Sequence, residues 1–165
     1  MCKVNRHLYT LRHNAILNFL KQYLQTHSSF HILCDQTSED IDSPLRIDLQ
    51  IKDHRSHKLW LIDVKVAYES DGNFRRCNDR NIQKYGEYKS LVESKLHGWF
   101  VSLDTFIVGS LGSWNEDNNK ILRTLGYDKD QQKHIALETI KRSIQWGCQI
   151  WKEHQSPRDM LNSKH

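Results

Sequence analysis

The sequence predicts one α/β domain in which a mixed sheet is flanked by helices. Residues 44–68 contain two runs where apolar and charged residues alternate, as they do in strands with two different faces. Before and after these runs, apolar residues recur every three or four positions, which is typical of one side of a helix. A chain of 165 residues is long enough for one such domain and leaves no room for a second.

The two runs are predicted to pair as an antiparallel hairpin. In the first run the apolar residues at 47, 49 and 51 share one face, and Asp48 stands on the other. In the second run Asp63 and Lys65 lie on a face that also holds apolar residues, which favours a central strand. Residues 52–58 between the runs are too few for a helix and rich in turn formers.

The remaining elements follow from apolar periodicity and from capping signals. In chain order we first expect a helix capped by Thr10 and running to about Leu24, then a strand at Phe30–Cys34 and the hairpin. Next we expect a helix from Asn78 or Asp79 to about Leu96 and a strand or strand pair at Trp99–Gly109. The last predicted elements are a short helix at about Asn118–Leu125 and a helix at about Gln131–Glu153, with Ile140, Ile144 and Trp151 on its inner side.

The predicted hairpin brings the carboxylates of Asp48 and Asp63 together. Two carboxylates about 4 Å apart repel by about 4 kcal/mol at an effective dielectric of about 20, so both stay ionised only with a cation between them. Hard divalent ions with oxygen ligands are the natural candidates. The alternative is a solvated hairpin with a surface Asp–Lys pair, which contributes at most about 1 kcal/mol.

The pattern Asp48…Asp63-Val64-Lys65 resembles the PD-(D/E)xK motif of restriction-endonuclease-like nucleases, with Ile47 in place of the usual proline. Four segments in order resemble one branch, the restriction-like endonuclease domains of site-specific non-LTR retrotransposon proteins. They are YTLRHNAIL, LRIDLQI with LWLIDVKVAYE, QKYGEYKSL, and FIVGSLGSWNEDNNKILRTLG. The likeness extends from Tyr9 to about Trp151.

The resemblance implies a restriction-endonuclease-like fold and a metal-dependent endonuclease that uses Mg²⁺ or Mn²⁺ to nick double-stranded target DNA for retrotransposon integration. It implies a location in the nucleus and a reverse transcriptase domain of the same element as a partner. Asp48 and Asp63 are the expected metal ligands and catalytic acids. If the second strand continues, Glu69 shares the parity of Asp63 and Lys65 and is either a third ligand or supporting acid, or a solvated residue at the end of the strand. The catalytic lysine is either Lys65, in the motif, or Lys84, on the following helix.

Basic residues around the predicted site are candidates for contacts with DNA phosphates, which provide most sequence-independent affinity. The candidates are Arg46, Lys52, Arg55, Lys58 and Arg80, with Tyr88 on the same predicted helical stripe as Lys84. Each of them taken singly is also an ordinary solvating surface residue.

The domain is expected at 9–155, followed by a polar tail at 156–165. By the resemblance, residues 1–8, which contain Cys2 and His7, are the remnant of a preceding zinc knuckle, but two residues cannot close a four-ligand zinc site. The four cysteines form no CxxC pair, and no apolar run is long enough for a signal peptide or a membrane span. These features predict an intracellular protein without a membrane partner.

The net charge of +4 permits a polyanionic partner without requiring one. Two alternatives to the nicking endonuclease stay open at this point. One is a catalytically silent nucleic-acid-binding module on the same fold, and the other is a junction or repair nuclease. The target sequence and the oligomeric state do not follow from the sequence.

Overall fold

The computed structural model describes residues 6–37, 41 and 43–155; Cys2 and the tail at 156–165 lie outside this range. Its elements are α1 (Arg6–His27), β1 (His31–Gln36), β2 (Ile47–Asp53), β3 (Lys58–Ala67), α2 (Asn73–Lys95), β4 (Phe100–Gly109), α3 (Asp117–Thr124) and α4 (Lys129–His154). No helix in the described part of the chain is long and apolar enough to cross a membrane.

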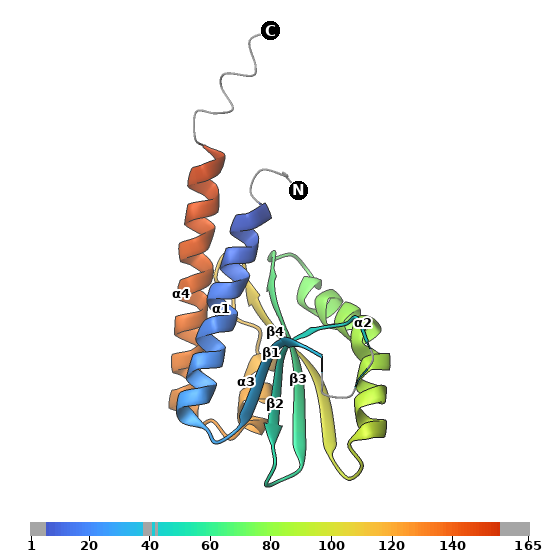
Figure 1. Cartoon of the computed structure of the whole chain (residues 1–165). Helices are drawn as coiled ribbons and strands as arrows, with labels where there is room; N and C mark the ends of the chain where they lie inside the picture. The colour runs from blue at the N-terminus through green and yellow to red at the C-terminus, as the bar shows by residue number, and fades with distance from the viewer. Residues whose placement is uncertain (1–5, 38–40, 42, 156–165) are drawn as a thin grey trace.

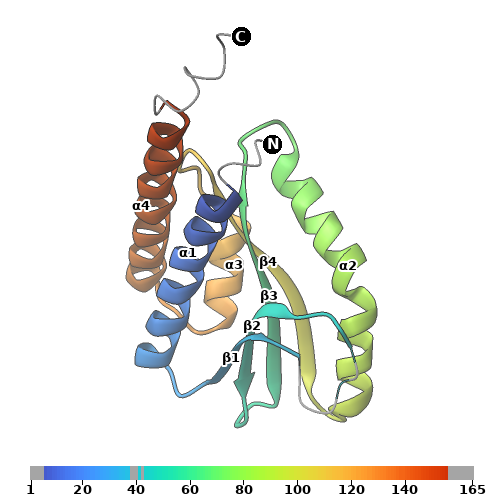
Figure 2. The ribbon, with the colours of Figure 1, turned by 45° about the horizontal axis from the view of Figure 1, so that its top comes forward.

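The four strands form one mixed sheet in the order β1-β2-β3-β4 (Figures 1 and 2). Neighbouring strands are antiparallel from β1 to β3, while β3 and β4 are parallel and are connected through α2. One face of the sheet packs against α1, α3 and α4, and the other packs against α2. The predicted α/β class, the flanked mixed sheet and the hairpin are therefore confirmed, whereas the specific restriction-endonuclease-like fold stays a prediction.

Two helices begin earlier than predicted. Thr10 is not a cap, because α1 already starts at Arg6 and the Thr10 hydroxyl donates to the Arg6 carbonyl inside the helix. The predicted domain boundary after residue 8 consequently falls within α1. The α2 helix starts at Asn73, directly after Gly72, whose φ of 69° is a left-handed conformation that glycine adopts without steric cost.

The inner side of α4 agrees with the prediction at Ile140, which packs against the core, but differs from it at Ile144 and Trp151. Ile144 and Trp151 are 43% and 60% exposed, whereas Ile135, Thr139 and Ser143 are buried. The Ser143 hydroxyl donates to the Gly109 carbonyl at 2.8 Å, so small polar residues of α4 contact the end of β4. Apolar spacing alone did not reveal that this helix buries a partly polar stripe.

Strict alternation fails in β2 at Asp48. Leu49 and Ile51 belong to the core cluster beneath α1, as expected for residues of one parity. Ile47 has the same parity but packs with Tyr85 in the cluster beneath α2. The side chains of β2 therefore change from one face of the sheet to the other between Ile47 and Leu49, and Asp48 lies at this change.

The outer edge of β4 is closed at one point by a side chain. The amide of Asn118, which is fully buried in α3, accepts from the Ile107 N–H at 2.9 Å and donates to the Ile107 carbonyl at 2.7 Å. It therefore satisfies both backbone groups that a neighbouring strand would satisfy. Buried backbone groups without partners are costly, so this amide fixes α3 against β4.

We expect Asn118→Ala to lower the free energy of unfolding by about 2 to 6 kcal/mol, because it leaves the Ile107 N–H and carbonyl without partners at about 1 to 3 kcal/mol each. Urea unfolding measures the loss. Arg123→Ala, an exposed change in the same helix, is the matched control and should cost less than about 0.5 kcal/mol. Equal stability of the two variants would show that the amide contact does not hold α3.

Candidate active site

The ladder between β2 and β3 ends at the pair Leu49 and Ile62. Asp48 and Asp63 each lie one residue beyond this pair, one on each strand, so the hairpin brings the two predicted acids to the same level of the sheet. Burial raises the pKa of Asp63, and the negative charge of Asp48 adds to the rise, so the two carboxylates are close enough to interact. That the two carboxylates share one cation stays a prediction.

The Asp48 carboxylate takes the place of a strand partner. Its Oδ2 accepts from the Val64 N–H at 2.7 Å. His13 of α1 completes the arrangement, because its Nε2 lies 3.2 Å from the same Asp48 oxygen and 3.1 Å from the Val64 carbonyl oxygen. Both of these partners are acceptors, so His13 Nε2 carries the proton. Asp48 and His13 together satisfy the two backbone groups of Val64 beyond the ladder.

This contact sets the charges of both partners. The hydrogen bond to Asp48 is the largest cause of a raised His13 pKa and outweighs the burial of the imidazole. Burial opposes ionisation of Asp48, but the hydrogen bonds from His13 and the Val64 N–H outweigh it and lower the Asp48 pKa. Asp48 is therefore held as a carboxylate beside a histidine whose pKa is raised.

Asp63 is in a different environment. Its side chain is almost completely buried, and the Lys65 ammonium lies 2.8 Å from Asp63 Oδ2. Burial nevertheless raises the pKa of Asp63, although Lys65 opposes the shift. A further cation close to this carboxylate would stabilise its charged form.

Lys84 reaches the same site from α2. Its Nζ donates to the Tyr85 hydroxyl at 2.7 Å, and that hydroxyl donates to the Arg46 carbonyl at 2.9 Å. Burial, followed by the charges of Asp63 and Asp48, raises the pKa of Tyr85 to about 12. Burial raises the pKa of Asp63 as well, and the positive charge of Lys84 opposes that rise. The two predicted lysines are therefore both close to the acids.

Glu69 is directed elsewhere. Its Oε1 accepts from the Leu111 N–H at 2.7 Å and from the Ser113 hydroxyl at 3.0 Å, and its Oε2 accepts from the Ser110 hydroxyl at 3.0 Å. A Cβ on Gly109 would lie 1.9 Å from Glu69 Oε1, so only glycine permits this approach. The carboxylate thus organises the loop after β4, which is a different role from the predicted metal ligand.

Three of the predicted DNA-binding residues do not surround the acids. Lys52, Arg55 and Lys58 lie at the turn of the hairpin, about 16 Å of extended strand from Asp48. The acids lie where the ladder ends, at the opposite end of the hairpin. The prediction that these three residues line the mouth of the site is therefore wrong.

The other three predicted DNA-binding residues differ in accessibility. Arg46 and Arg80 are exposed, Arg46 directly before β2 and Arg80 one helical turn before Lys84. Tyr88 is 1% exposed within the core beneath α2, where it is inaccessible to a phosphate. The two arginines consequently remain candidates for phosphate contacts, and the tyrosine does not.

Two neighbours of the site were missed by sequence reasoning. His13 lies within the quoted segment YTLRHNAIL, but a single histidine in an amphipathic helix gives no signal of its contact with a strand. The second neighbour is Asn81 of α2, which is 2% exposed. Its buried Nδ2 donates to the Thr105 hydroxyl at 2.7 Å, so it joins α2 to β4 beside Asp63.

The donor set at Asp48 and Asp63 is compatible with a hard divalent cation. Both contacts of the Asp48 carboxylate with described residues use Oδ2, so Oδ1 is available to a ligand. Mg²⁺ needs only one or two carboxylates when water and substrate phosphate supply the other oxygens. Among the residues that the structure describes, no group of three His, Cys, Asp or Glu side chains is arranged to hold a metal alone.

We expect Glu69→Gln to lower the free energy of unfolding at pH 7 by about 1 to 3 kcal/mol, because a neutral amide replaces the charge-assisted hydrogen bonds that the carboxylate accepts from the loop at 110–113. The Glu69 pKa is lowered: burial opposes this, but the Leu111 and Ser113 hydrogen bonds outweigh it. Its contribution is therefore present above the unfolded-state pKa and is lost as the pH falls through the folded-state pKa.

Urea unfolding at pH 7 and at pH 3 measures both effects, with Glu87→Gln on the exposed face of α2 as the control. The difference between wild type and Glu69→Gln should shrink at pH 3. A loss at pH 7 that appears only with Mg²⁺ present would instead support the metal-ligand role.

No protein-family model matches this chain, and no curated protein matches it. The functional assignment consequently depends on the geometry of the site and on the motif resemblance.

Proposed function

We propose that this protein is a metal-dependent DNA endonuclease that nicks double-stranded target DNA during retrotransposon integration. The observation that carries the proposal is the meeting of Asp48, Asp63 and Lys65 where the β2–β3 ladder ends. The motif and the four segments resembling restriction-like endonuclease domains support the choice of this reaction. A nuclear location and a reverse transcriptase partner belong to the same proposal and depend on the resemblance alone.

Asp48 and Asp63 would hold a Mg²⁺ or Mn²⁺ ion, which supplies an acidified water and charge stabilisation at the scissile phosphate when bound. The environment of each acid suits this role. Asp48 is ionised before the ion arrives, and its orientation is fixed by His13 and Val64. Asp63 is buried with a raised pKa, so its ionised form gains most from an added cation.

Lys65 is the better placed of the two lysines to act on the reacting groups. Its ammonium already lies against Asp63 on the same strand face, so it can orient a water beside that carboxylate without a change of chain conformation. Lys84 is engaged with the Tyr85 hydroxyl and ring, one helical turn from the exposed Arg80. We therefore assign Lys65 to the chemical step and assign Lys84 with Arg80 and Arg46 to the DNA phosphates.

A second candidate function is a catalytically silent nucleic-acid-binding module. One observation favours it: Glu69, the candidate third ligand, is engaged by the loop at 110–113. The proposal of a junction or repair nuclease differs in substrate alone. Nicked, branched and linear DNA compared side by side as substrates separate it from the first proposal.

We expect Asp48→Asn and Asp63→Asn each to reduce Mg²⁺-dependent nicking of supercoiled plasmid by at least about 100-fold. Changes to groups that merely support metal ligands already cost about 10- to 100-fold, and these changes remove the ligands themselves. Conversion to nicked and linear DNA is followed with Mg²⁺, with Mn²⁺ and with EDTA. Asp117→Asn, an exposed acid on α3, is the control and should cleave normally.

Plasmid binding without cleavage by the wild-type protein in either metal would favour the silent module. Unchanged nicking by both Asn variants would remove these two residues from the site.

Lys65→Ala and Lys84→Ala are expected to affect different quantities. Loss of a group that acts only in the transition state lowers the single-turnover rate at saturating DNA and leaves binding unchanged, which is the expectation for Lys65→Ala. Lys84→Ala should weaken DNA binding and reduce its log–log salt dependence by about one unit, for one lost phosphate contact. Rapid-quench kinetics and titrations at several salt concentrations measure both. The opposite pattern would assign catalysis to Lys84.

A further inference from the structure

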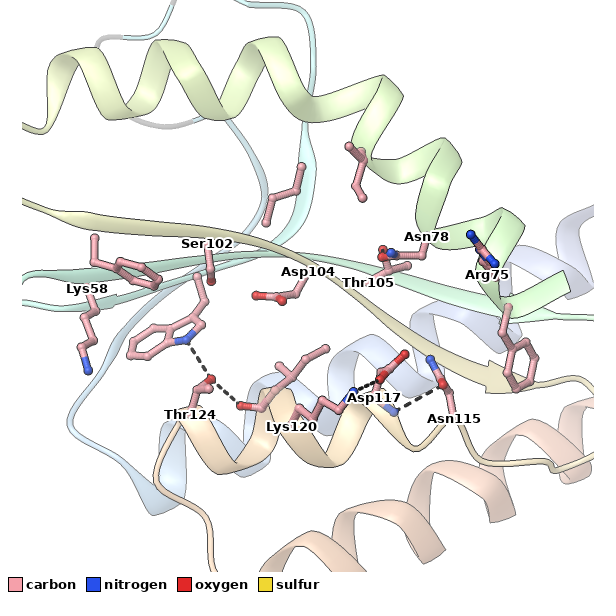
Figure 3. A pocket seen from close by; sticks show the side chains of 16 residues that line it. Lys58, Arg75, Asn78, Ser102, Asp104, Thr105, Asn115, Asp117, Lys120 and Thr124 are labelled. Carbon is pink, nitrogen blue, oxygen red and sulfur yellow. Dashed lines mark hydrogen bonds and ion pairs between the residues drawn. The ribbon is translucent and has the colours of Figure 1, made fainter. Parts of the chain in front are cut away.

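A groove of about 1020 Å³ runs along the outer edge of β4, and one of its lining residues, Thr105, pairs with Asp63 on the neighbouring strand. Figure 3 shows it between α2 and α3, with β4 along its floor. Its lining includes Trp60, Ile82, Phe100 and Asp104. The groove wraps around the strand edge, because residues from both faces of β4 contribute to it.

The floor of the groove presents unpaired backbone groups. The N–H and carbonyl of Ile107 point outward, away from β3, and are hydrogen-bonded to the Asn118 amide. The N–H of Phe100 points inward, toward β3, and donates to the His57 carbonyl. Backbone groups alternate in direction along a strand, so those of Leu103 and Thr105 also point outward. No described residue bonds to the outward groups of these two residues. An open strand edge therefore lies between the two helices.

Apart from Asp104 and the cover that Asn118 provides at Ile107, the edge lacks the usual protections against pairing. Natural edge strands are commonly blunted by lysine, proline or a short length. The ten residues of β4 include no lysine, arginine or proline. Two apolar side chains at the groove are also exposed to an unusual extent: Phe100 is 63% and Ile82 is 52% exposed.

A carboxylate inside the groove lacks a cationic partner within the described part of the chain. Figure 3 shows the Asp104 side chain directed into the space between β4 and α3. No described cation lies within ion-pair distance of it, and the lysine that α3 contributes to the groove, Lys120, is paired with Asp117 at 2.6 Å. Burial raises the Asp104 pKa, and the Ser102 hydroxyl and the Lys89 charge oppose this only in part. A cation delivered into the groove would stabilise the charged form of this carboxylate.

We propose that this groove binds an extended basic segment of a partner protein, which adds to the sheet as a strand beside β4 and places a lysine or arginine on Asp104. Main-chain hydrogen bonds to Leu103 and Thr105 provide pairing, and the cation selects the segment. The apolar side chains next to it pack on Phe100 and Ile82. This interaction is independent of the proposed nuclease function.

Two other occupants fit less well. In a second copy of the chain pairing through the same edge, the incoming β4 would bring no lysine or arginine to Asp104, because the strand contains none. A nucleic acid strand has no row of amide groups to match a strand edge, although Lys58, Arg75 and Lys120 also line the groove. A partner segment that combines extended backbone with a cation satisfies both features of the groove.

The test uses a fluorescein-labelled, acetylated and amidated heptapeptide with a central arginine and alternating valine and threonine on either side. Fluorescence anisotropy with the full chain should show saturable binding. Replacing the arginine with citrulline, or Asp104 with Asn, should each weaken binding by about 10-fold or more, as for a charge-assisted contact. Combining the two changes should add little further loss, because both remove the same contact.

Strand pairing is tested with two peptides that are N-methylated at alternate positions. Only one of them keeps the N–H groups that face β4, so one should bind and the other should not. Hydrogen exchange of the Leu103 and Thr105 amides should slow when the peptide is bound. Equal binding of the two methylated peptides, equal binding to Asp104→Asn, or stronger competition by a single-stranded oligonucleotide would overturn the proposal.

Discussion

The structure depends on the requirement that every backbone group of a buried strand has a hydrogen-bond partner. The β2 strand stops pairing with β3 at Leu49, so the Val64 N–H and carbonyl would be left unsatisfied in the interior. Asp48 and His13 satisfy them. The same requirement places Asn118 against Ile107 at the other side of the sheet. In both places a side chain from another element replaces a missing strand and thereby fixes how that element packs.

This requirement makes the two acids chemically unequal. Asp48 is bound to an amide proton and to a histidine, which together favour the carboxylate. Asp63 has a lysine partner, but the burial that surrounds it favours the neutral acid. A single cation between them would therefore change the ionisation of one acid far more than that of the other. Both residues are aspartates, so their difference in pKa arises from their surroundings. Asp48 accepts the Val64 N–H where the ladder ends, and Asp63 does not.

The sequence was sufficient for the fold class, the hairpin and the meeting of the two acids, because all three follow from period-two alternation and a short turn. It was not sufficient for contacts made across long separations. Alternation predicts that Ile47 and Leu49 pack on the same face of the sheet, but they pack on opposite faces. Arg55 and Lys58 are near the acids in sequence, which suggested that they line the site. The hairpin pairing places them at its turn, at the opposite end of the ladder from the acids.

The role of Glu69 and the burial of Tyr88 could not be predicted from the sequence, because both depend on contacts with distant parts of the chain. Glu69 was placed by strand parity, but its carboxylate is captured by a loop more than forty residues later, which only the absence of a side chain on Gly109 permits. Tyr88 shares a helical stripe with exposed basic residues, yet the sheet covers it. Periodicity describes a face, while burial depends on which neighbour that face meets.

The partnership of His13 with Asp48 and Val64 bears on the order in which the molecule assembles. These hydrogen bonds join residues separated by 35 and 51 positions, whereas the β2–β3 hairpin closes over a short turn. Contacts between distant residues generally form more slowly than local ones. A folding chain would consequently hold the two carboxylates side by side before α1 docks to set the charge of one of them, so the docking of α1 converts a local hairpin into a site with defined ionisation.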